Sequence, residues 1–108
     1  MFGAVPAQTT ELTGPGRDEL ELPAVLHALS DPVRLEIVGA LRECGGERRC
    51  GSFTVPVTKS TLTHHFRVLR EAGIIMQRQE GTARLSRLRT DDLEARFPGV
   101  FEAILSAA

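Results

Sequence analysis

The alternation of apolar and polar residues predicts a mainly helical chain that contains a β-hairpin. Apolar side chains recur at steps of three and four, as on one side of a helix, over residues 22–29, 33–44, 59–72 and 91–105. Two shorter runs rich in strand-forming residues, 74–79 and 82–88, flank the dipeptide Glu80-Gly81 and predict the two strands and the turn of a hairpin.

Residues at the expected helix ends favour these boundaries. Asp31 and Thr58 can cap the second and third helices, because their side-chain oxygens can accept hydrogen bonds from exposed backbone N–H groups. Gly73 can end the third helix in a left-handed conformation. Thr90 is expected to cap the last helix, which Pro98-Gly99 interrupts.

Residues 47–56 have the least regular pattern. A helix-turn-helix would require a helix here to buttress the helix at 59–72. Gly51 and the β-branched residues of this segment disfavour a long one. We therefore expect a short helix over residues 51–55, with Pro56 in the turn that follows.

Length and composition narrow the class of protein. The chain has 108 residues, 42% of them hydrophobic, which suffices for one domain over residues 20–108 after a loose arm at residues 1–19. Two cysteines are too few for a disulfide-stapled secreted fold, and we see no secretory signal and no apolar run of about 18 residues. We expect a cytoplasmic protein without a membrane span and, lacking a catalytic constellation, not an enzyme.

Charge is divided unevenly along the chain. The formal net charge is −1, but residues 58–89 contain seven basic and two acidic residues, a local charge of +5. A locally basic segment can neutralise phosphates although the whole chain is nearly neutral. The alternative is an arginine-rich face that is merely solvated.

The outer face of the helix at 59–72 has the chemistry of a DNA-reading surface. Its first two turns hold Ser60, Thr61, Thr63 and His64, which lie where a recognition helix reaches base edges. Lys59 and Arg67 are expected to hold phosphates, whereas His65 borders the apolar side and is interpreted as a partly buried packing residue. The residues around the hairpin turn that we expect to contact DNA, unless the hairpin is simply exposed, are Arg78, Gln79 and Arg84.

Three motifs resemble the arsenic-repressor (ArsR/SmtB) family of bacterial regulators. Residues 28–37 resemble the signature of the family's second helix, residues 59–73 its recognition helix, and residues 77–81 stand where the family has its wing. The resemblance implies an α+β, mainly helical winged helix-turn-helix, with a two-stranded β-hairpin as the wing. It also implies a homodimer that binds a palindromic operator in double-stranded DNA, usually a repressor that an effector releases.

The metal sites known in that family are not intact here. Where many members carry Cys-Val-Cys, this chain has Glu47-Arg48-Arg49, and its terminal helix has no histidine. Cys44 and Cys50 are therefore weak candidates for a metal site or a redox pair, and they can equally be structural residues. The effector and any cofactor stay unassigned.

The first and last helices have more apolar residues than a small core needs, which favours a two-fold dimer interface. The residues expected there are Leu22, Leu26, Val100, Phe101, Ile104 and Leu105. An alternative function is a winged-helix interaction module, such as a regulatory subunit with weak DNA affinity of its own. A gel shift with the purified protein would separate the two functions.

Overall fold

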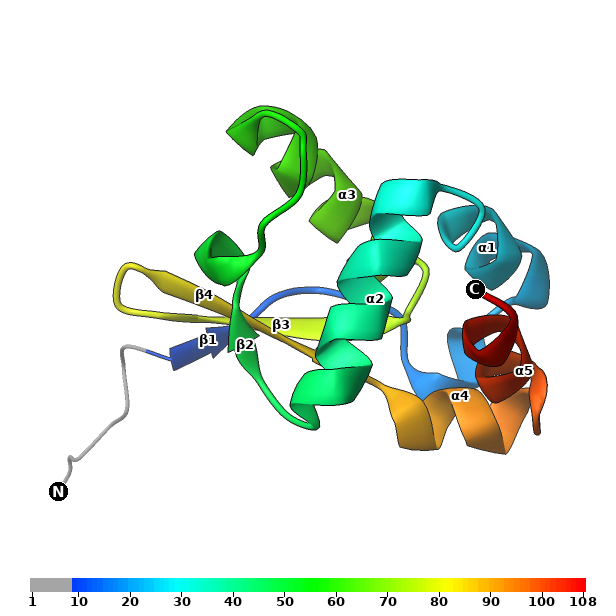
Figure 1. The fold of residues 1–108 in the computed structure, drawn as a ribbon. Coiled ribbons are helices and arrows are strands. Elements are labelled where there is room, and N and C mark those ends of the chain that lie inside the picture. Colours follow the sequence, from blue (N-terminus) through cyan, green and yellow to red (C-terminus); the bar gives the residue numbers. More distant parts are fainter. Residues whose placement is uncertain (1–8) are drawn as a thin grey trace, which may run out of the picture.

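A computed structural model describes residues 9–108, which form a group of helices packed on a small antiparallel sheet (Figure 1). The helices are α1 (Leu22–Ala28), α2 (Pro32–Cys44), α3 (Lys59–Glu71), α4 (Thr90–Arg96) and α5 (Val100–Ala107). The strands are β1 (Thr9–Glu11), β2 (Arg48–Arg49), β3 (Ile75–Glu80) and β4 (Ala83–Leu88). Two 3-10 turns complete the chain, η1 (Arg17–Glu19) and η2 (Cys50–Ser52). No helix among residues 9–108 is long and apolar enough to cross a membrane.

The expected helix boundaries are confirmed with one exception. Asp31 caps α2 by accepting hydrogen bonds from two backbone N–H groups, Thr58 caps α3, and Gly73 follows α3 in a left-handed conformation (φ 85°). Thr90 is not the cap of α4 but its first residue. Arg89 takes the capping position, because its backbone N–H is held by the carbonyl of Ile74 (2.9 Å) at the end of the sheet.

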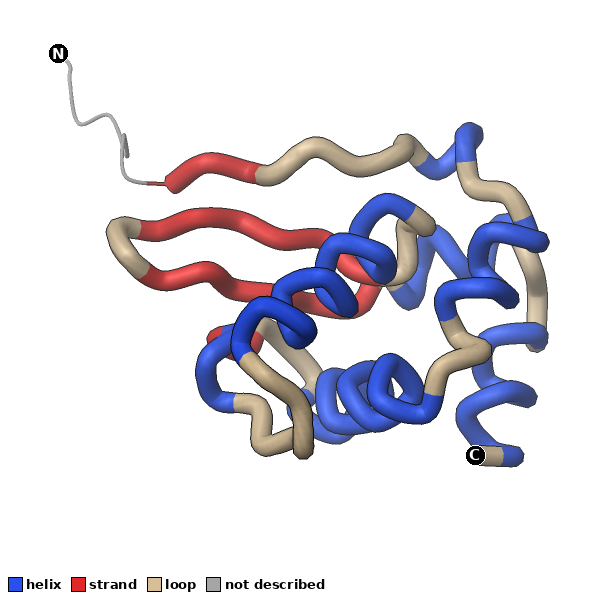
Figure 2. Tube along the Cα trace, turned by 90° about the horizontal axis from the view of Figure 1, so that it is seen from above, coloured by secondary structure: helices blue, strands red, loops and turns tan. Residues whose placement is uncertain are grey.

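The hairpin forms as predicted, with its turn one residue later than expected. Glu80 pairs with Ala83, so Gly81 and Thr82 make the two-residue turn, with Gly81 in a left-handed conformation (φ 60°). The strand order in the sheet is β1-β3-β4-β2, and every neighbouring pair is antiparallel. Seen from above, the hairpin turn projects beyond the helices, and β1 runs beside the hairpin (Figure 2).

The short helix expected over residues 51–55 is wrong. The chain instead forms β2 against β4, a 3-10 turn at η2, and an irregular segment that leads to Thr58. Gly51 and the β-branched residues give a helix little support, and Arg48 and Arg49 find backbone partners in the sheet. Phe53 still reaches the recognition helix, since its ring lies edge-on to that of Phe66 with the centroids 5.3 Å apart.

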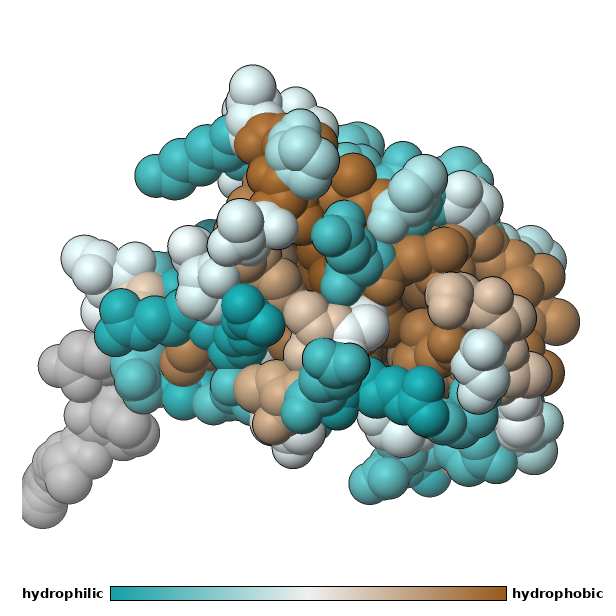
Figure 3. Space-filling view, in the orientation of Figure 1, coloured by the Kyte–Doolittle hydropathy of each residue, from teal (hydrophilic) through white to brown (hydrophobic). Residues whose placement is uncertain are grey.

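The core lies among the five helices and against the end of the sheet at Ile75. Its fully buried members include Leu20, Val25, Ile37, Val38, Leu41, Leu69, Ile74, Ile75 and Leu93. Phe101 and Leu105, expected at a dimer interface, are buried in this core instead. Leu22 and Leu26 remain 37% and 46% exposed, and hydrophobic residues gather on the surface around α1 and α5 (Figure 3).

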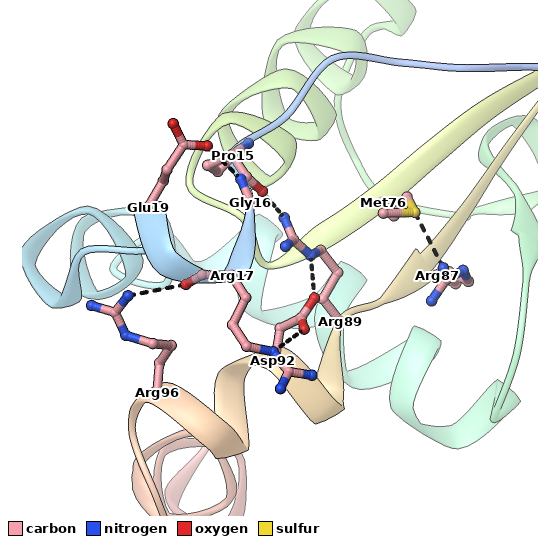
Figure 4. A network of polar contacts seen from close by, with 9 residues as sticks. All are labelled: Pro15, Gly16, Arg17, Glu19, Met76, Arg87, Arg89, Asp92 and Arg96. Atoms are coloured by element: carbon pink, nitrogen blue, oxygen red, sulfur yellow. Dashed lines mark hydrogen bonds and ion pairs between the residues drawn. The ribbon is translucent and has the colours of Figure 1, made fainter.

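Residues 9–19 take a defined course, whereas residues 1–8 of the expected loose arm lie outside the described residues. After β1 the segment passes the end of α3 and is fixed to α4 by polar contacts (Figure 4). Buried Arg89 donates to the carbonyl of Pro15 (2.5 Å) and to Asp92 (3.0 Å), and Arg17 donates to the same carboxylate (2.6 Å). Sequence patterns did not predict this course, because its partners lie far away along the chain.

Candidate nucleic-acid interface

The N-terminal half of α3 presents hydroxyl groups that hydrogen bonds within the start of the helix hold in place. The Thr58 hydroxyl oxygen accepts a hydrogen bond from the backbone N–H of Thr61 (3.2 Å), and its hydroxyl donates to the Thr61 hydroxyl (2.9 Å). The Thr63 hydroxyl donates to the carbonyl of Lys59 (3.0 Å). Thr61 therefore keeps a hydrogen to donate, and Thr63 keeps lone pairs to accept. Base edges and bound water can form hydrogen bonds with this donor and with this acceptor.

The exposed side chains of α3 form two neighbouring rows. Lys59, Thr63 and Arg67 follow one another at steps of four, so they lie along one side of the helix, and Ser60 and His64 form the next row. All five are exposed. Within residues 9–108, neither Lys59 nor Arg67 forms an ion pair with a carboxylate. Their charges are therefore available to an external anion.

A groove separates the row of Lys59 from the hairpin, which we call the wing. Lys59 and Thr63 line one wall of this groove, Gln79 and Arg84 line the other, and none of its lining residues is acidic. Arg84 is oriented by donating its Nε hydrogen to Oε1 of Gln79 (3.0 Å). The space-filling view shows mostly hydrophilic residues over the wing (Figure 3). Cations on both walls would draw a polyanion into the groove.

The structure does not bring Arg78 to this groove. Successive side chains of a strand point to opposite faces, and Gln77 points toward α3, so Gln79 shares its face and Arg78 points away. Arg78 is bound there by two carboxylates, with contacts of 2.6 and 2.9 Å to Glu47 and 2.8 Å to Glu80. The hydrogen bonds from Arg78 hold the pKa of Glu47 below its ordinary value, and the same bonds raise the pKa of Arg78.

The apolar side of α3 is fixed to α2 through a buried polar contact. Arg34 Nη1 lies 3.1 Å from Nδ1 of His65, and because arginine has no acceptor, that nitrogen of His65 is the acceptor. Arg34 also donates to the carbonyl of Ala28 (2.6 Å). The interpretation of His65 as a packing residue is confirmed, since it is 7% exposed.

Two arginines at this site were not singled out from the sequence as structural, although the pattern contained the signal. Arg34 stands three positions before Ile37 and four before Val38, so helical spacing places it on the buried side of α2. Arg70 stands by its spacing on the polar side of α3, yet it is half-buried and donates to the carbonyl of Thr13 (3.1 Å). Helical spacing places a side chain on a face and does not reveal its partner.

The two cysteines differ in their surroundings. Cys44 is exposed, and its thiol donates to the carbonyl of Glu47 (3.5 Å). Cys50 is half-buried between Ser86 (3.1 Å) and Gln77 (3.3 Å), and burial raises the pKa of its thiol. Across residues 9–108, no three His, Cys, Asp or Glu side chains gather in a group that could hold a metal ion. Neither thiol therefore belongs to such a group in the described part of the chain.

Comparison with known proteins identifies the family. Residues 31–76, from the cap of α2 to the start of β3, match the family described as bacterial regulatory protein, arsR family. The chain is 34% identical over 82 residues to the uncharacterized HTH-type transcriptional regulator YceK of Bacillus subtilis, across 74% of this chain and 82% of that protein. It is 36% identical over 59 residues to an uncharacterized HTH-type transcriptional regulator of Methanocaldococcus jannaschii, across 54% of this chain and 66% of that protein.

The matches agree with the motifs and with the geometry. The resemblance to the family is confirmed, and so is the prediction of a transcriptional regulator. The matched segment contains α2, η2 and α3, the elements that position the exposed rows of the interface. The chain therefore belongs to the arsR family of bacterial regulatory proteins, and it is a DNA-binding transcriptional regulator of the helix-turn-helix type.

Proposed function

We propose that the protein is a homodimeric repressor that binds a palindromic operator in the cytoplasm and is released by an effector. The observation that carries the DNA-binding mode is the groove between α3 and the wing, with cations on both walls and no acidic lining residue. Ser60 and His64, in the row next to that of Lys59, would read base edges together with Thr61. Lys59 and Arg67 would neutralise phosphates, and Gln79 and Arg84 would contact the backbone from the wing.

The apolar surface that the protomer leaves uncovered supports a dimer. Leu22 and Leu26 are the exposed large hydrophobic residues of the described chain, and Val100 and Ile104 on α5 are half-buried. Burying such a patch against its two-fold copy removes apolar area from water at a gain of roughly 25 cal/mol per Å². Sedimentation equilibrium tests this: the wild type should be dimeric and Leu26→Glu monomeric. A monomeric wild type at micromolar concentration would refute the dimer.

The DNA-binding mode is tested by footprinting on the promoter region of the protein's own gene. We expect protection of two half-sites about one helical turn apart, because a two-fold dimer presents two copies of α3. A competition with unrelated DNA should show specific binding at least about a thousandfold tighter than non-specific binding. Protection that is equal on all sequences would contradict operator recognition. Transcription from that promoter should rise when the gene is deleted, and a fall would indicate an activator.

A second candidate function rests on one observation, the reduction of the first helix of the motif to the three residues of η2. A helix at this place normally crosses the DNA backbone, so its loss would suit a winged helix that binds a partner protein instead. A gel shift with the purified protein alone decides between the two. Binding at nanomolar concentration supports the operator-binding repressor, and micromolar, sequence-independent binding supports the interaction module.

A further inference from the structure

A glutamine is completely buried on the face of the wing that points toward the recognition helix. Gln77 and its cross-strand partner Ser86 are both 0% exposed. Burying a polar side chain costs free energy unless its hydrogen-bonding groups find partners. An apolar pair would fill the same space at no such cost, so the partners of Gln77 indicate what the polar pair contributes.

Every hydrogen-bonding group of the Gln77 side chain has a partner, and the partners come from different elements. Its Oε1 accepts from Arg70 Nη1 of α3 (2.7 Å). Its Nε2 donates to the Ser86 hydroxyl of β4 (3.0 Å) and to the Cys50 sulfur of η2 (3.3 Å). The Cys50 sulfur and the Ser86 hydroxyl oxygen are also 3.1 Å apart. We call these four residues, Arg70, Gln77, Ser86 and Cys50, the Gln77 network.

The N-terminal segment joins this network at two points. The carbonyl of Thr13 accepts from Arg70 Nε (3.1 Å), which fixes the second edge of the guanidinium group. The backbone N–H of Leu12 donates to the carbonyl of Gln77 (2.8 Å). Arg70 is thus held between the wing and the N-terminal segment, and its bonds turn it away from the exposed rows of α3.

The network lies directly beneath the surface that would meet DNA. Gln77 and Arg70 line a recess of about 100 Å³ that also has Thr63, Arg67 and Arg84 in its walls. Apolar contacts between a helix and a sheet tolerate small rotations, whereas hydrogen bonds fix both distance and direction. A fully satisfied buried polar network therefore specifies one arrangement of the elements that it joins.

We propose that the Gln77 network is a positioning device that sets the orientation of the wing relative to α3. Arg70, Gln77 and Ser86 are positioning residues, which act on DNA through Arg67 and Arg84 without touching it. This inference deepens the proposed function and rests on it for its effect on DNA. Its structural part, a wing held at one orientation, stands apart from DNA binding and is measured separately.

The experiment uses Gln77→Met, which keeps the length of the side chain and removes its hydrogen bonds. Spin labels at Glu71 and Thr82, both exposed, are introduced through noncanonical amino acids so that the thiols stay untouched. Double electron–electron resonance of the DNA-free protein should give a narrow distance distribution in the wild type and a broader one in Gln77→Met. Ile37→Val is the matched control, because it weakens the core at a fully buried site outside the network.

The second readout is operator affinity as a function of salt. Affinity of Gln77→Met should fall about tenfold if the wing is correctly oriented about a tenth of the time. The slope of log Kd against log salt concentration should equal that of the wild type, because every residue that neutralises a phosphate is still present. Arg70→Gln should behave in the same way. A slope lower by about 0.9 would show that Arg70 itself touches a phosphate and would overturn its role as a positioning residue.

The outcomes separate this inference from the proposed function. An unchanged distance distribution, with affinity within twofold of that of Ile37→Val, overturns the inference and shows that the network merely stabilises the fold. If the wild type binds no operator, the proposed function fails, and the distance measurement still decides whether the network orients the wing. If Gln77→Met does not fold, Ser86→Ala removes one hydroxyl from the network and takes its place in both measurements.

Discussion

The two faces of the wing carry arginines with opposite surroundings. On the inner face, Arg84 contacts the neutral amide of Gln79 and lines the groove beside α3. On the outer face, Arg78 is held by the carboxylates of Glu47 and Glu80. The two residues lie close to the same turn and carry the same formal charge. Strand alternation and acidic neighbours, which a count of local charge ignores, decide which arginine has its charge available to DNA.

The largest effect is expected from removing the two exposed cations of α3, which lie opposite the inner face of the wing. The double variant Lys59→Ala with Arg67→Ala should lose about 100-fold in operator affinity, since charged hydrogen bonds contribute about tenfold or more each. The salt slope should fall by about 1.8, or about 0.9 for each phosphate that is no longer neutralised. Fluorescence anisotropy titrations across a salt series measure both. Equal losses for specific and non-specific DNA are expected, because phosphates carry no sequence information.

Replacing one arginine on each face of the wing by alanine tests the comparison directly. Arg84→Ala should weaken operator binding about tenfold and lower the salt slope by about 0.9. Arg78→Ala should leave affinity within about twofold, because its charge is already neutralised by carboxylates within the protein. The same titrations measure the pair side by side. Comparable losses for both variants would mean that both faces of the wing meet DNA, and the distinction between them would fail.

The outer face should matter for stability at acid pH. The hydrogen bonds from Arg78 lower the pKa of Glu47 in the folded state, so their stabilisation is present above its ordinary value of 4.5 and is lost as pH falls through the lowered pKa. Glu47→Gln should remove this part of the pH dependence, and the effect should be small because solvent screens the pair. Thermal unfolding of both proteins from about pH 3 to about pH 7 measures the difference. Parallel curves would show that the pair contributes nothing.

The smallest effect is expected at Arg87, and it shows whether the direction of an arginine or its lack of an ion pair decides DNA contact. Arg87 is exposed on the outer face, where it donates to the sulfur of Met76 (3.1 Å) and lies near the Glu47 carboxylate without forming an ion pair with it. Arg87→Ala should leave both operator affinity and salt slope within error of the wild type, because the residue points away from the groove. A measurable fall in the slope would show that an arginine without an ion pair can also contact DNA from the outer face.

The elements with local signals were predicted from the sequence. Helices α1, α2 and α3, the hairpin and the break before α5 all follow from apolar periodicity and from residues such as Asp31, Thr58 and Gly73. The family followed from the motif at α3. The errors lie where long-range partners outweigh local preference. Arg48 and Arg49 became a strand because β4 offered an edge, and Arg89 became a cap because the carbonyl of Ile74 held it.

The candidate site was predicted in part for the same reason. Helical spacing placed Lys59, Thr63 and Arg67 on one side, but it did not show that this side faces the wing. Alternation along β3 contained the information that Arg78 and Gln77 point to opposite faces. Gln77 follows Ile75 by two residues and shares its buried face, so its burial could be predicted from the sequence. Its hydrogen bond to Arg70 could not, because Arg70 lies on another element.

The pairing of β1 with β3 has a consequence for how the chain is made. Thr9 lies opposite Glu80 in the sheet, so the two strands are separated by roughly seventy residues, a long-range contact that slows folding. During synthesis β1 must wait until the hairpin has left the ribosome. Until then, the outer edge of β3 is an unpaired strand edge that can associate with another chain. Arrival of the first strand is therefore a late event, and it covers the edge of β3 from Arg78 to Glu80.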